Sequence, residues 1–332
     1  MGRGPTTIYH QSLNDNYVKG TLTCLRPEVI QQRIHTGFPL VLNIEPTNAC
    51  NARCHYCPRE MTVQSQGTHY LDLEDFKRVI DQIPQKLIML NLHKDGEPLL
   101  HRDLPAMVAY ARKKDAAEVV HLNTNGIPLH SRVGRGIIEQ GIDDITISVD
   151  AASEASYRRF KRVKGLSRLE GHIRDTIDYR NRLNSPTHIR VKIMEFDQCP
   201  PEEIELFRER WTGVADEVQV TGVHSWSGAI DLRVTDETTP QRYPCALLWY
   251  MLAVNSNGQV SICNVDWNYS GVVGSIHTQS VAEIWNGPRL RMIRNNHLQA
   301  IWNNPQVCEK CVVWVSVGNM RNFLQDQEKF LP

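Results

Sequence analysis

The chain has 332 residues, and its 37 Lys+Arg and 37 Asp+Glu give a formal net charge of zero. This balance provides no field that would recruit nucleic acid or an anionic membrane surface. No apolar run approaches the ~18 residues that span a bilayer, and no signal peptide is recognisable at the N-terminus. We therefore expect a cytoplasmic protein that binds neither nucleic acid nor membrane.

Short apolar strands alternate with longer amphipathic segments from about residue 38 to 225. This alternation predicts right-handed βαβ units and a parallel sheet, with helices between the strands, for example over 73–83 and 104–113. Six units are too few for a closed eight-stranded barrel. The strands are predicted at 38–44, 87–92, 119–123, 144–149, 189–193 and 218–221.

A second unit is predicted after the polar connection 235–240. It begins with a β-hairpin over 251–263, whose Asn257-Gly258 step is a strong turn signal, and continues with a helix over 281–295. The expected division of the chain is an N-terminal extension (1–37), the parallel unit (38–234), the second unit (235–315) and a C-terminal tail (316–332).

Seven of the nine cysteines fall into two groups. An odd cysteine count without a secretion signal argues against a disulfide framework and favours metal or cluster ligands in a reducing compartment. Cys50, Cys54 and Cys57 form a C-x3-C-x2-C triplet directly after the first strand. A closed [4Fe–4S] site uses four cysteines, so three would leave one iron open; a zinc knuckle, the alternative, would also need a fourth ligand.

A strand followed by this cysteine loop resembles the radical S-adenosylmethionine (radical SAM) superfamily. The resemblance implies a partial (β/α)6 barrel and a [4Fe–4S] cluster held by the three cysteines. It also implies S-adenosyl-L-methionine chelated to the open iron, and an electron donor such as flavodoxin or ferredoxin.

Motifs after the second and third strands resemble cofactor contacts of this superfamily. Gly96, Glu97 and Pro98 resemble the Gly-Gly-Glu-Pro motif that holds the amino group of S-adenosylmethionine, with Asp95 in place of the first glycine. The segment Asn123-Thr124-Asn125-Gly126 resembles a strand-end Thr-Asn-Gly motif, and Asn123 and Thr124 are its candidate cofactor contacts. The alternative for this second motif is a helix-entry turn.

Polar residues of the fourth and fifth strands complete the expected cofactor site. By the same resemblance, Ser148 and Asp150 would contact the ribose hydroxyls. Arg190 or Lys192 would meet the methionine carboxylate, although a buried salt bridge would also explain either side chain.

The second cysteine group is Cys245, Cys263, Cys308 and Cys311, with intervals of 18, 45 and 3. Four cysteines ending in C-x2-C can close a metal site completely, and structural zinc is the generic alternative. The surrounding segments 257–260 and 281–286 resemble the SPASM/Twitch extension of radical SAM enzymes. That resemblance implies one auxiliary [4Fe–4S] cluster, as in the shorter Twitch form and in aminocyclitol dehydrogenases of this subgroup.

Together these resemblances predict a radical SAM oxidoreductase. A 5′-deoxyadenosyl radical would abstract hydrogen from a secondary alcohol of an aminocyclitol, sugar or nucleoside, and the auxiliary cluster would accept an electron as a ketone forms. Glu195, Asp197 and His224 are candidates for the general base, and the alternative for each is a surface or hydrogen-bonded residue without a catalytic role.

Other outcomes stay open. Epimerisation or decarboxylation is one, with Cys199 as a hydrogen donor in an epimerase, although most unassigned cysteines are simply small buried hydrophobic residues. Modification of a ribosomal peptide is another. A zinc-binding module without enzymatic activity is the remaining class.

Overall fold

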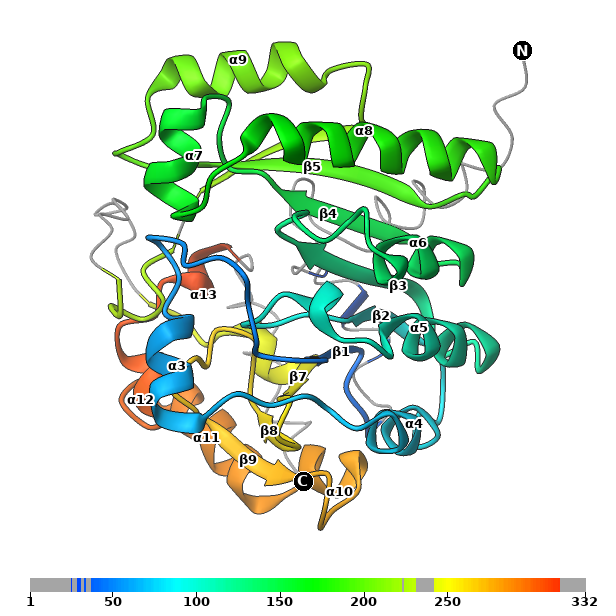
Figure 1. Ribbon diagram of the computed structural model, residues 1–332. Coiled ribbons are helices and arrows are strands. Elements are labelled where there is room, and N and C mark those ends of the chain that lie inside the picture. Colours follow the sequence, from blue (N-terminus) through cyan, green and yellow to red (C-terminus); the bar gives the residue numbers. More distant parts are fainter. Residues whose placement is uncertain are drawn as a thin grey trace.

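The computed structural model describes residues 25, 29–30, 33, 37–222, 224–230 and 242–316. Its centre is an open nine-stranded sheet in the order β6-β5-β4-β3-β2-β1-β7-β8-β9 (Figure 1). The first six strands run parallel, so the expected partial (β/α)6 barrel is confirmed. These strands are β1 (Val41–Ile44), β2 (Leu87–Asn91), β3 (Ala117–Thr124), β4 (Asp144–Ser148), β5 (His188–Glu195) and β6 (Glu217–Gly222).

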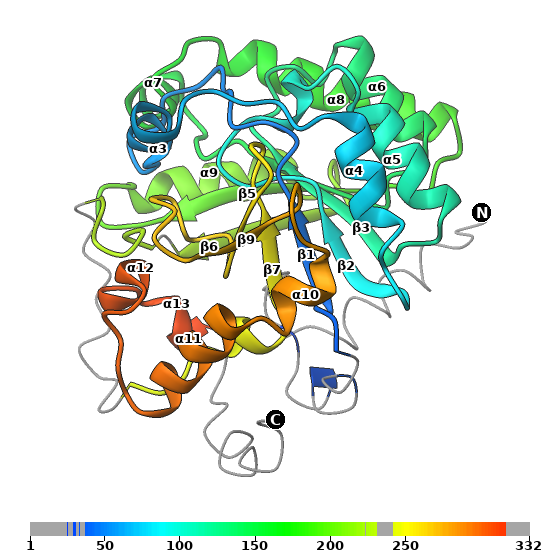
Figure 2. The same cartoon turned by 90° about the horizontal axis from the view of Figure 1, so that it is seen from below.

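Helices connect the parallel strands and lie along the outer side of the sheet (Figure 2). Helix α4 shows why they form where they do: the Asp72 side chain caps its N-terminus by accepting a hydrogen bond from Glu74 N–H, and Phe76, Val79 and Ile80 form its buried stripe. The helices are α3 (Arg59–Gln66), α4 (Leu73–Ile80), α5 (Leu104–Lys113), α6 (Arg132–Glu139), α7 (Glu154–Lys161), α8 (Leu166–Arg182) and α9 (Pro201–Trp211).

The C-terminal segment continues the same sheet. Strand β7 (Met251–Val254) pairs parallel with β1, and β8 (Gln259–Ser261) and β9 (Val272–Ser275) follow antiparallel. The predicted hairpin is therefore confirmed, with Gly258 at the positive φ of 80° that its turn requires. Its attachment to β1 was not predicted, and it places the second cysteine group beside the strand that leads into the first.

The single helix predicted over 281–295 is wrong. The structure has two helices instead, α10 (Val281–Trp285) and α11 (Pro288–Leu298). Pro288 has no backbone N–H for the helical ladder and occupies the first turn of a new helix, where that donor is not needed. Two short helices, α12 (Gln306–Glu309) and α13 (Val313–Ser316), complete the C-terminal region.

Several predicted segments lie wholly or mainly outside the described residues. They are the connection 235–240, the tail beyond residue 316 and most of the extension 1–37, including Cys24. Within the extension, Leu25 and Ile30 are fully buried in the hydrophobic core. In the described ranges, no helix combines the length and apolarity needed to cross a membrane.

Glu45, directly after β1, ties the barrel to the C-terminal hairpin. Its carboxylate is fully buried, and Oε1 accepts a hydrogen bond from Asp95 N–H at 2.8 Å. Oε2 accepts from the backbone N–H and the hydroxyl of Ser256, at 3.0 and 2.8 Å. One side chain therefore holds the loop after β2 and the turn after β7 against the end of β1.

Glu45→Ala should destabilise the protein strongly, because it leaves two buried backbone N–H groups without an acceptor. Each such group costs about 1–3 kcal/mol, so the apparent thermal unfolding midpoint of the anaerobic holoprotein should fall by roughly 5 °C or more. Glu205→Ala, at an exposed position of α9, is the control and should leave the midpoint nearly unchanged. Equal midpoints for the two variants would contradict the role given to Glu45.

Candidate functional site

The three thiols of the first cysteine group lie together in the loop that follows β1. Cys57 N–H donates to the Cys54 carbonyl at 3.2 Å. Burial raises the pKa of Cys50, Cys54 and Cys57, and a neighbouring cysteine of the loop raises the pKa of Cys50 and Cys57 further. Buried thiols of this kind become thiolates when a metal supplies compensating positive charge, so this loop fits an iron–sulfur cluster.

The Gly96-Glu97 turn is pressed against the backbone of the cysteine loop. Glu97 N–H donates to the Ala49 carbonyl at 2.8 Å. A Cβ atom on Gly96 would lie 2.1 Å from the Thr47 carbonyl oxygen and 2.7 Å from that of Ala49. Only glycine fits this position, which explains why the motif keeps Gly96 although Asp95 replaces the glycine before it. Pro98 then begins a short 3-10 helix (Pro98–Leu100).

Glu97 joins this turn to the end of β3. Its buried carboxylate accepts hydrogen bonds from the Thr124 hydroxyl at 2.7 Å, Asn125 N–H at 2.6 Å and Leu99 N–H at 3.0 Å. Burial raises its pKa, while these hydrogen bonds oppose the shift. The Asn125 amide donates to Asn51 at 2.7 Å and lies 3.8 Å from Cys50 Sγ. The predicted residues Glu97 and Thr124 therefore meet beside the cysteine loop.

Asp95, the departure from the usual motif, pairs with a buried lysine. The Lys94 ammonium lies 2.5 Å from Asp95 Oδ2, and the Lys94 side chain is fully buried. It also donates to the Asp266 carbonyl at 3.2 Å and lies 5.0 Å from the centre of the Tyr269 ring. Burial raises the pKa of Asp95 to about 7, with Lys94 opposing the shift. This ion pair joins the motif to the C-terminal region.

Two layers of polar side chains line the face of the sheet turned away from the helices. The deeper layer forms a hydrogen-bonded ladder across five strands, with contacts between 2.7 and 3.2 Å, through Asn43, Asn91, His121, Thr146 and Arg190. Because side chains of one face recur every second residue, the next layer toward the carboxyl ends follows directly. It consists of Glu45, His93, Asn123, Ser148 and Lys192.

The upper layer brings together three of the predicted cofactor contacts. Ser148 lies opposite Lys192 in the register of β4 and β5. The Asn123 amide contacts His93 at 3.0 Å. His93 was not predicted; its position two residues after Asn91, in the alternation of β2, is the sequence signal that identifies it.

Asp150 lies just beyond this layer and is held by protein groups. Its Oδ2 accepts from the Tyr56 hydroxyl at 2.9 Å and pairs with the Lys161 ammonium at 2.6 Å. Its Oδ1 is buried and has no hydrogen-bond partner among the described residues. Lys161 and Tyr56 were not predicted, and they connect Asp150 to the cysteine loop.

Arg190 and Lys192 have different surroundings although both are on β5. Arg190 is buried and pairs with Asp144 and Glu217, each at 2.9 Å. This is the buried salt bridge considered from the sequence, so its guanidinium is already engaged. Lys192 is half-buried in the middle of β5, and burial lowers its pKa.

Among the predicted bases, only His224 lies close to the polar layers. Glu195 and Asp197 are exposed. His224 packs against Trp226, with ring centres 4.5 Å apart, and its Nδ1 accepts from Trp226 N–H at 3.3 Å. Burial, and secondarily the charge of Lys192, lower the pKa of His224 to about 4. The neutral ring therefore carries its hydrogen on Nε2 and presents a donor, not a base.

Cys199 belongs to the hydrophobic core. Its Sγ contacts the Pro200 carbonyl oxygen at 3.8 Å, and burial raises its pKa to about 11. These surroundings match the alternative of a small buried hydrophobic residue.

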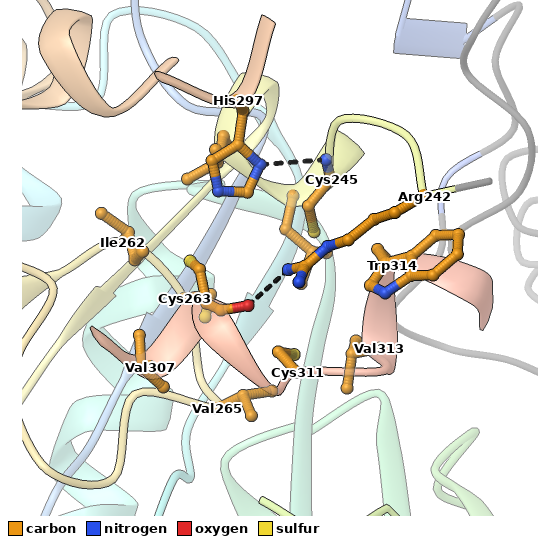
Figure 3. A pocket seen from close by; sticks show the side chains of 13 residues that line it. Arg242, Cys245, Ile262, Cys263, Val265, His297, Val307, Cys311, Val313 and Trp314 are labelled. Atoms are coloured by element: carbon orange, nitrogen blue, oxygen red, sulfur yellow. Dashed lines mark hydrogen bonds between the residues drawn. The ribbon is translucent and has the colours of Figure 1, made fainter. Parts of the chain in front are cut away.

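The second cysteine group surrounds one cavity (Figure 3). Cys245, Cys263, Cys308 and Cys311 come from four separate positions in the chain, and burial raises the pKa of all four thiols. In the described ranges, no three His, Cys, Asp or Glu side chains form a site for a single metal ion. Four thiols around a cavity are the ligand set of a closed [4Fe–4S] cluster.

Family models agree with this fold and ligand geometry. Residues 44–184 match the radical SAM superfamily, and residues 245–312 match SPASM, an iron-sulfur cluster-binding domain. The chain therefore belongs to the radical SAM superfamily and is an enzyme of the branch that carries a SPASM domain. The expected cofactors are confirmed: a [4Fe–4S] cluster, an auxiliary iron–sulfur cluster and S-adenosyl-L-methionine.

Several curated relatives are named GTP 3′,8-cyclase. The protein from Xanthomonas axonopodis pv. citri is 29% identical over 281 residues, which cover 79% of this chain and 80% of that protein. The one from Desulforamulus reducens is 25% identical over 231 residues, covering 61% and 69%. The one from Chlorobaculum tepidum is 30% identical over 135 residues, covering 39% and 40%.

Solved structures show the same fold at low sequence identity. BtrN in complex with AdoMet and 2-DOIA aligns with a TM-score of 0.57 and 18% identity, covering 82% of this chain and 92% of that one. Streptococcus suis SuiB bound to the precursor peptide SuiA aligns with a TM-score of 0.61 and 13% identity, covering 80% and 69%. At these identities the likeness concerns the fold alone.

Gly96→Ala should abolish most cofactor cleavage, because its methyl group would displace the cysteine loop or the Glu97 turn. A displacement of about 1 Å costs roughly 100-fold in rate, so 5′-deoxyadenosine formation by the anaerobic holoenzyme should fall by about that factor. The matched control is Gly171→Ala in α8, where a Cβ meets nothing within 4 Å. Equal rates for both variants would show that the close contact is not needed.

Proposed function

We propose that this radical SAM enzyme oxidises a secondary alcohol of an aminocyclitol, sugar or nucleoside to a ketone. The observation that carries the proposal is the cavity surrounded by Cys245, Cys263, Cys308 and Cys311. Four protein ligands leave no open iron for substrate, so an auxiliary cluster held there exchanges electrons and does not act as a Lewis acid. A substrate radical that must lose an electron requires such an acceptor.

Converting a secondary alcohol to a ketone removes one hydrogen atom, one proton and one electron. When bound, S-adenosylmethionine and the two clusters supply acceptors for the hydrogen atom and the electron. The protein must therefore supply a base for the hydroxyl proton, hold the substrate and exclude water.

Lys192 is the side chain best suited to accept that proton. It belongs to the upper polar layer, next to Ser148 in register. Burial lowers its pKa, with the nearby charge of Lys161 acting in the same direction and Asp150 opposing it. A larger share of Lys192 is then the neutral amine near neutral pH, and a neutral amine can accept a proton. Exposed carboxylates such as Glu195 lack this placement.

The remaining residues would hold S-adenosylmethionine. Gly96, Glu97 and Pro98 stand beside the cysteine loop, where the amino group would bind. Ser148 and the unpartnered Oδ1 of Asp150 are suited to the ribose hydroxyls. We no longer propose that Arg190 binds the methionine carboxylate of S-adenosylmethionine, because its guanidinium already pairs with Asp144 and Glu217.

Direct contacts between the two cysteine regions support electron exchange between them. The Thr62 hydroxyl donates to the Trp267 carbonyl at 2.9 Å, so helix α3 touches the segment after Cys263. The Trp226 indole donates to the Tyr56 carbonyl at 2.9 Å, and the Trp267 indole donates to the Trp226 carbonyl at 3.0 Å. These contacts would keep the two cofactor sites at a fixed separation.

A second candidate is a cyclisation of a purine nucleotide. The names of the curated relatives favour it, because they are GTP 3′,8-cyclases at 25 to 30% identity. GTP therefore belongs among the probes of any activity assay. Consumption of GTP, with no ketone formed from any alcohol, would replace the dehydrogenase proposal.

Lys192→Gln should stop ketone formation while the enzyme still cleaves S-adenosylmethionine. The anaerobic holoenzyme is incubated with aminocyclitols, monosaccharides, nucleosides or GTP, and ketones are captured with a hydrazine reagent. Wild-type ketone yield should match 5′-deoxyadenosine, whereas the variant should lose about 100-fold or more of its ketone. Because the neutral amine is the active form, the wild-type rate should rise with pH until it levels off below the ordinary pKa of lysine.

The control for this variant is Lys164→Gln, at an exposed position after α7. It should retain full ketone formation. If Lys192→Gln instead loses cofactor cleavage together with the ketone, Lys192 binds S-adenosylmethionine and is not the base.

Cys199→Ala should leave the wild-type yield of ketone intact, because Cys199 packs in the core and a dehydrogenase returns no hydrogen to the substrate. An epimerase would behave differently: its variant would form 5′-deoxyadenosine without the epimer. The measurement compares ketone, epimer and 5′-deoxyadenosine by mass spectrometry in deuterated solvent. Solvent deuterium at the substrate carbon, lost in Cys199→Ala, would contradict the dehydrogenase.

A further inference from the structure

His297, on α11, lines the cavity that Cys245, Cys263, Cys308 and Cys311 surround, which we call the auxiliary cavity (Figure 3). One of its ring nitrogens has no hydrogen-bond partner among the described residues. The residue is 1% exposed, and its Nδ1 receives a hydrogen bond from Cys245 N–H at 3.3 Å. A backbone amide can only donate, so Nδ1 carries no hydrogen and Nε2 must carry it. Nε2 is buried and has no hydrogen-bond partner among the described residues.

Arg242 supplies a second buried donor at the same cavity. Its Nη1 donates to the Glu309 carbonyl at 2.8 Å and its Nη2 to the Cys308 carbonyl, which fixes the guanidinium against the C-x2-C segment. The guanidinium also stacks 4.6 Å from the centre of the Trp302 ring. Its Nε is buried and lacks a hydrogen-bond partner within the described ranges.

The composition of the cavity wall indicates what these donors bind. Beside the cysteines, His297 and Arg242, the residues that line it are apolar or aromatic: Leu247, Leu248, Ile262, Val265, Val307, Val313 and Trp314. A buried N–H without an acceptor costs about 1–3 kcal/mol. The acceptors that this wall offers are sulfur atoms, those of the cysteines and the sulfides of the cluster they hold.

We propose that His297 Nε2–H and Arg242 Nε–H donate hydrogen bonds to sulfur atoms of the auxiliary cluster and raise its reduction potential. Hydrogen bonds to cluster sulfurs, and positive charge beside them, stabilise the reduced form, which carries one more electron. His297 is a positioning residue as well, because its Nδ1 holds the backbone of Cys245. The proposal depends on the auxiliary cluster and holds whatever substrate the enzyme oxidises or cyclises.

The test is a potentiometric titration of the anaerobic holoenzyme without substrate, followed by electron paramagnetic resonance. Adding S-adenosylmethionine identifies the signal of the first cluster, and the signal that does not respond is the auxiliary one. His297→Leu should lower the auxiliary midpoint so that the ratio of reduced to oxidised cluster at a fixed potential falls about tenfold, ~59 mV for a one-electron couple.

Companion variants separate hydrogen bonding from packing. His297→Gln retains an acceptor for Cys245 N–H and a donor for the cavity, so it should recover most of the midpoint. Arg242→Lys keeps the charge without Nε–H and should lower the ratio by a smaller factor, about threefold. His277→Leu, an exposed histidine on the loop after β9, is the matched control and should change nothing.

A second readout tests the hydrogen bond directly. Pulsed resonance of the reduced auxiliary cluster, before and after exchange into deuterated water, should show an exchangeable proton coupled to the iron spins, and His297→Leu should lose it. Unchanged midpoints in both His297→Leu and Arg242→Lys, with about eight irons per chain retained, would overturn the proposal. Loss of iron in His297→Leu that His297→Gln does not restore would overturn it too, since His297 would then be an iron ligand.

Discussion

The buried carboxylate of Glu45 is the interaction on which the site depends. It receives three hydrogen bonds, one from the loop after β2 and two from the turn after β7, at the point where β1 enters the cysteine loop. A buried carboxylate is costly unless its oxygens have donors, so the three segments are held where their N–H and O–H groups meet it. The hydrogen bonds of Glu45 therefore hold the loop after β2 and the turn after β7 in place at the end of β1, where the first cysteine loop begins.

The two polar layers of the barrel have different roles: the deeper one stabilises the fold, and we propose that the upper one contacts ligands. In the deeper layer most side chains contact one another: Arg190 pairs with Asp144 and Glu217, and Asn91 bridges Asn43 and His121. Asn43 Nδ2 is an exception, because it is buried without a hydrogen-bond partner among the described residues. The upper layer includes Ser148, the last residue of β4, and Lys192 opposite it on β5, whose pKa the charge of Cys54 influences. The strand alternation therefore separates a layer that is mainly engaged by protein contacts from the layer that we propose to contact ligands.

Local patterns predicted the parts of the fold that are themselves local. The strands and the Asn257-Gly258 hairpin each depend on neighbours in sequence, and both predictions are confirmed. The pairing of strands that are far apart in the sequence could not be predicted from local patterns, because no residue around Met251 indicates that β7 pairs with β1. The sequence left open whether Glu195 faces the site or the surface, because it does not show how far a strand extends beyond its buried part; in the structure Glu195 is exposed.

The protonation of the cysteine thiols couples cluster binding to the folded state in both cysteine regions. In the protein alone, burial raises the pKa of all seven grouped cysteines, so both loops hold neutral thiols. Binding iron must then release protons and replace them with metal charge, which couples cluster assembly to pH and to the folded state. Lys161 beside Cys54 and Arg242 beside Cys308 offset the thiolate charge that remains. The same cations that assist assembly therefore also favour adding an electron to the finished clusters.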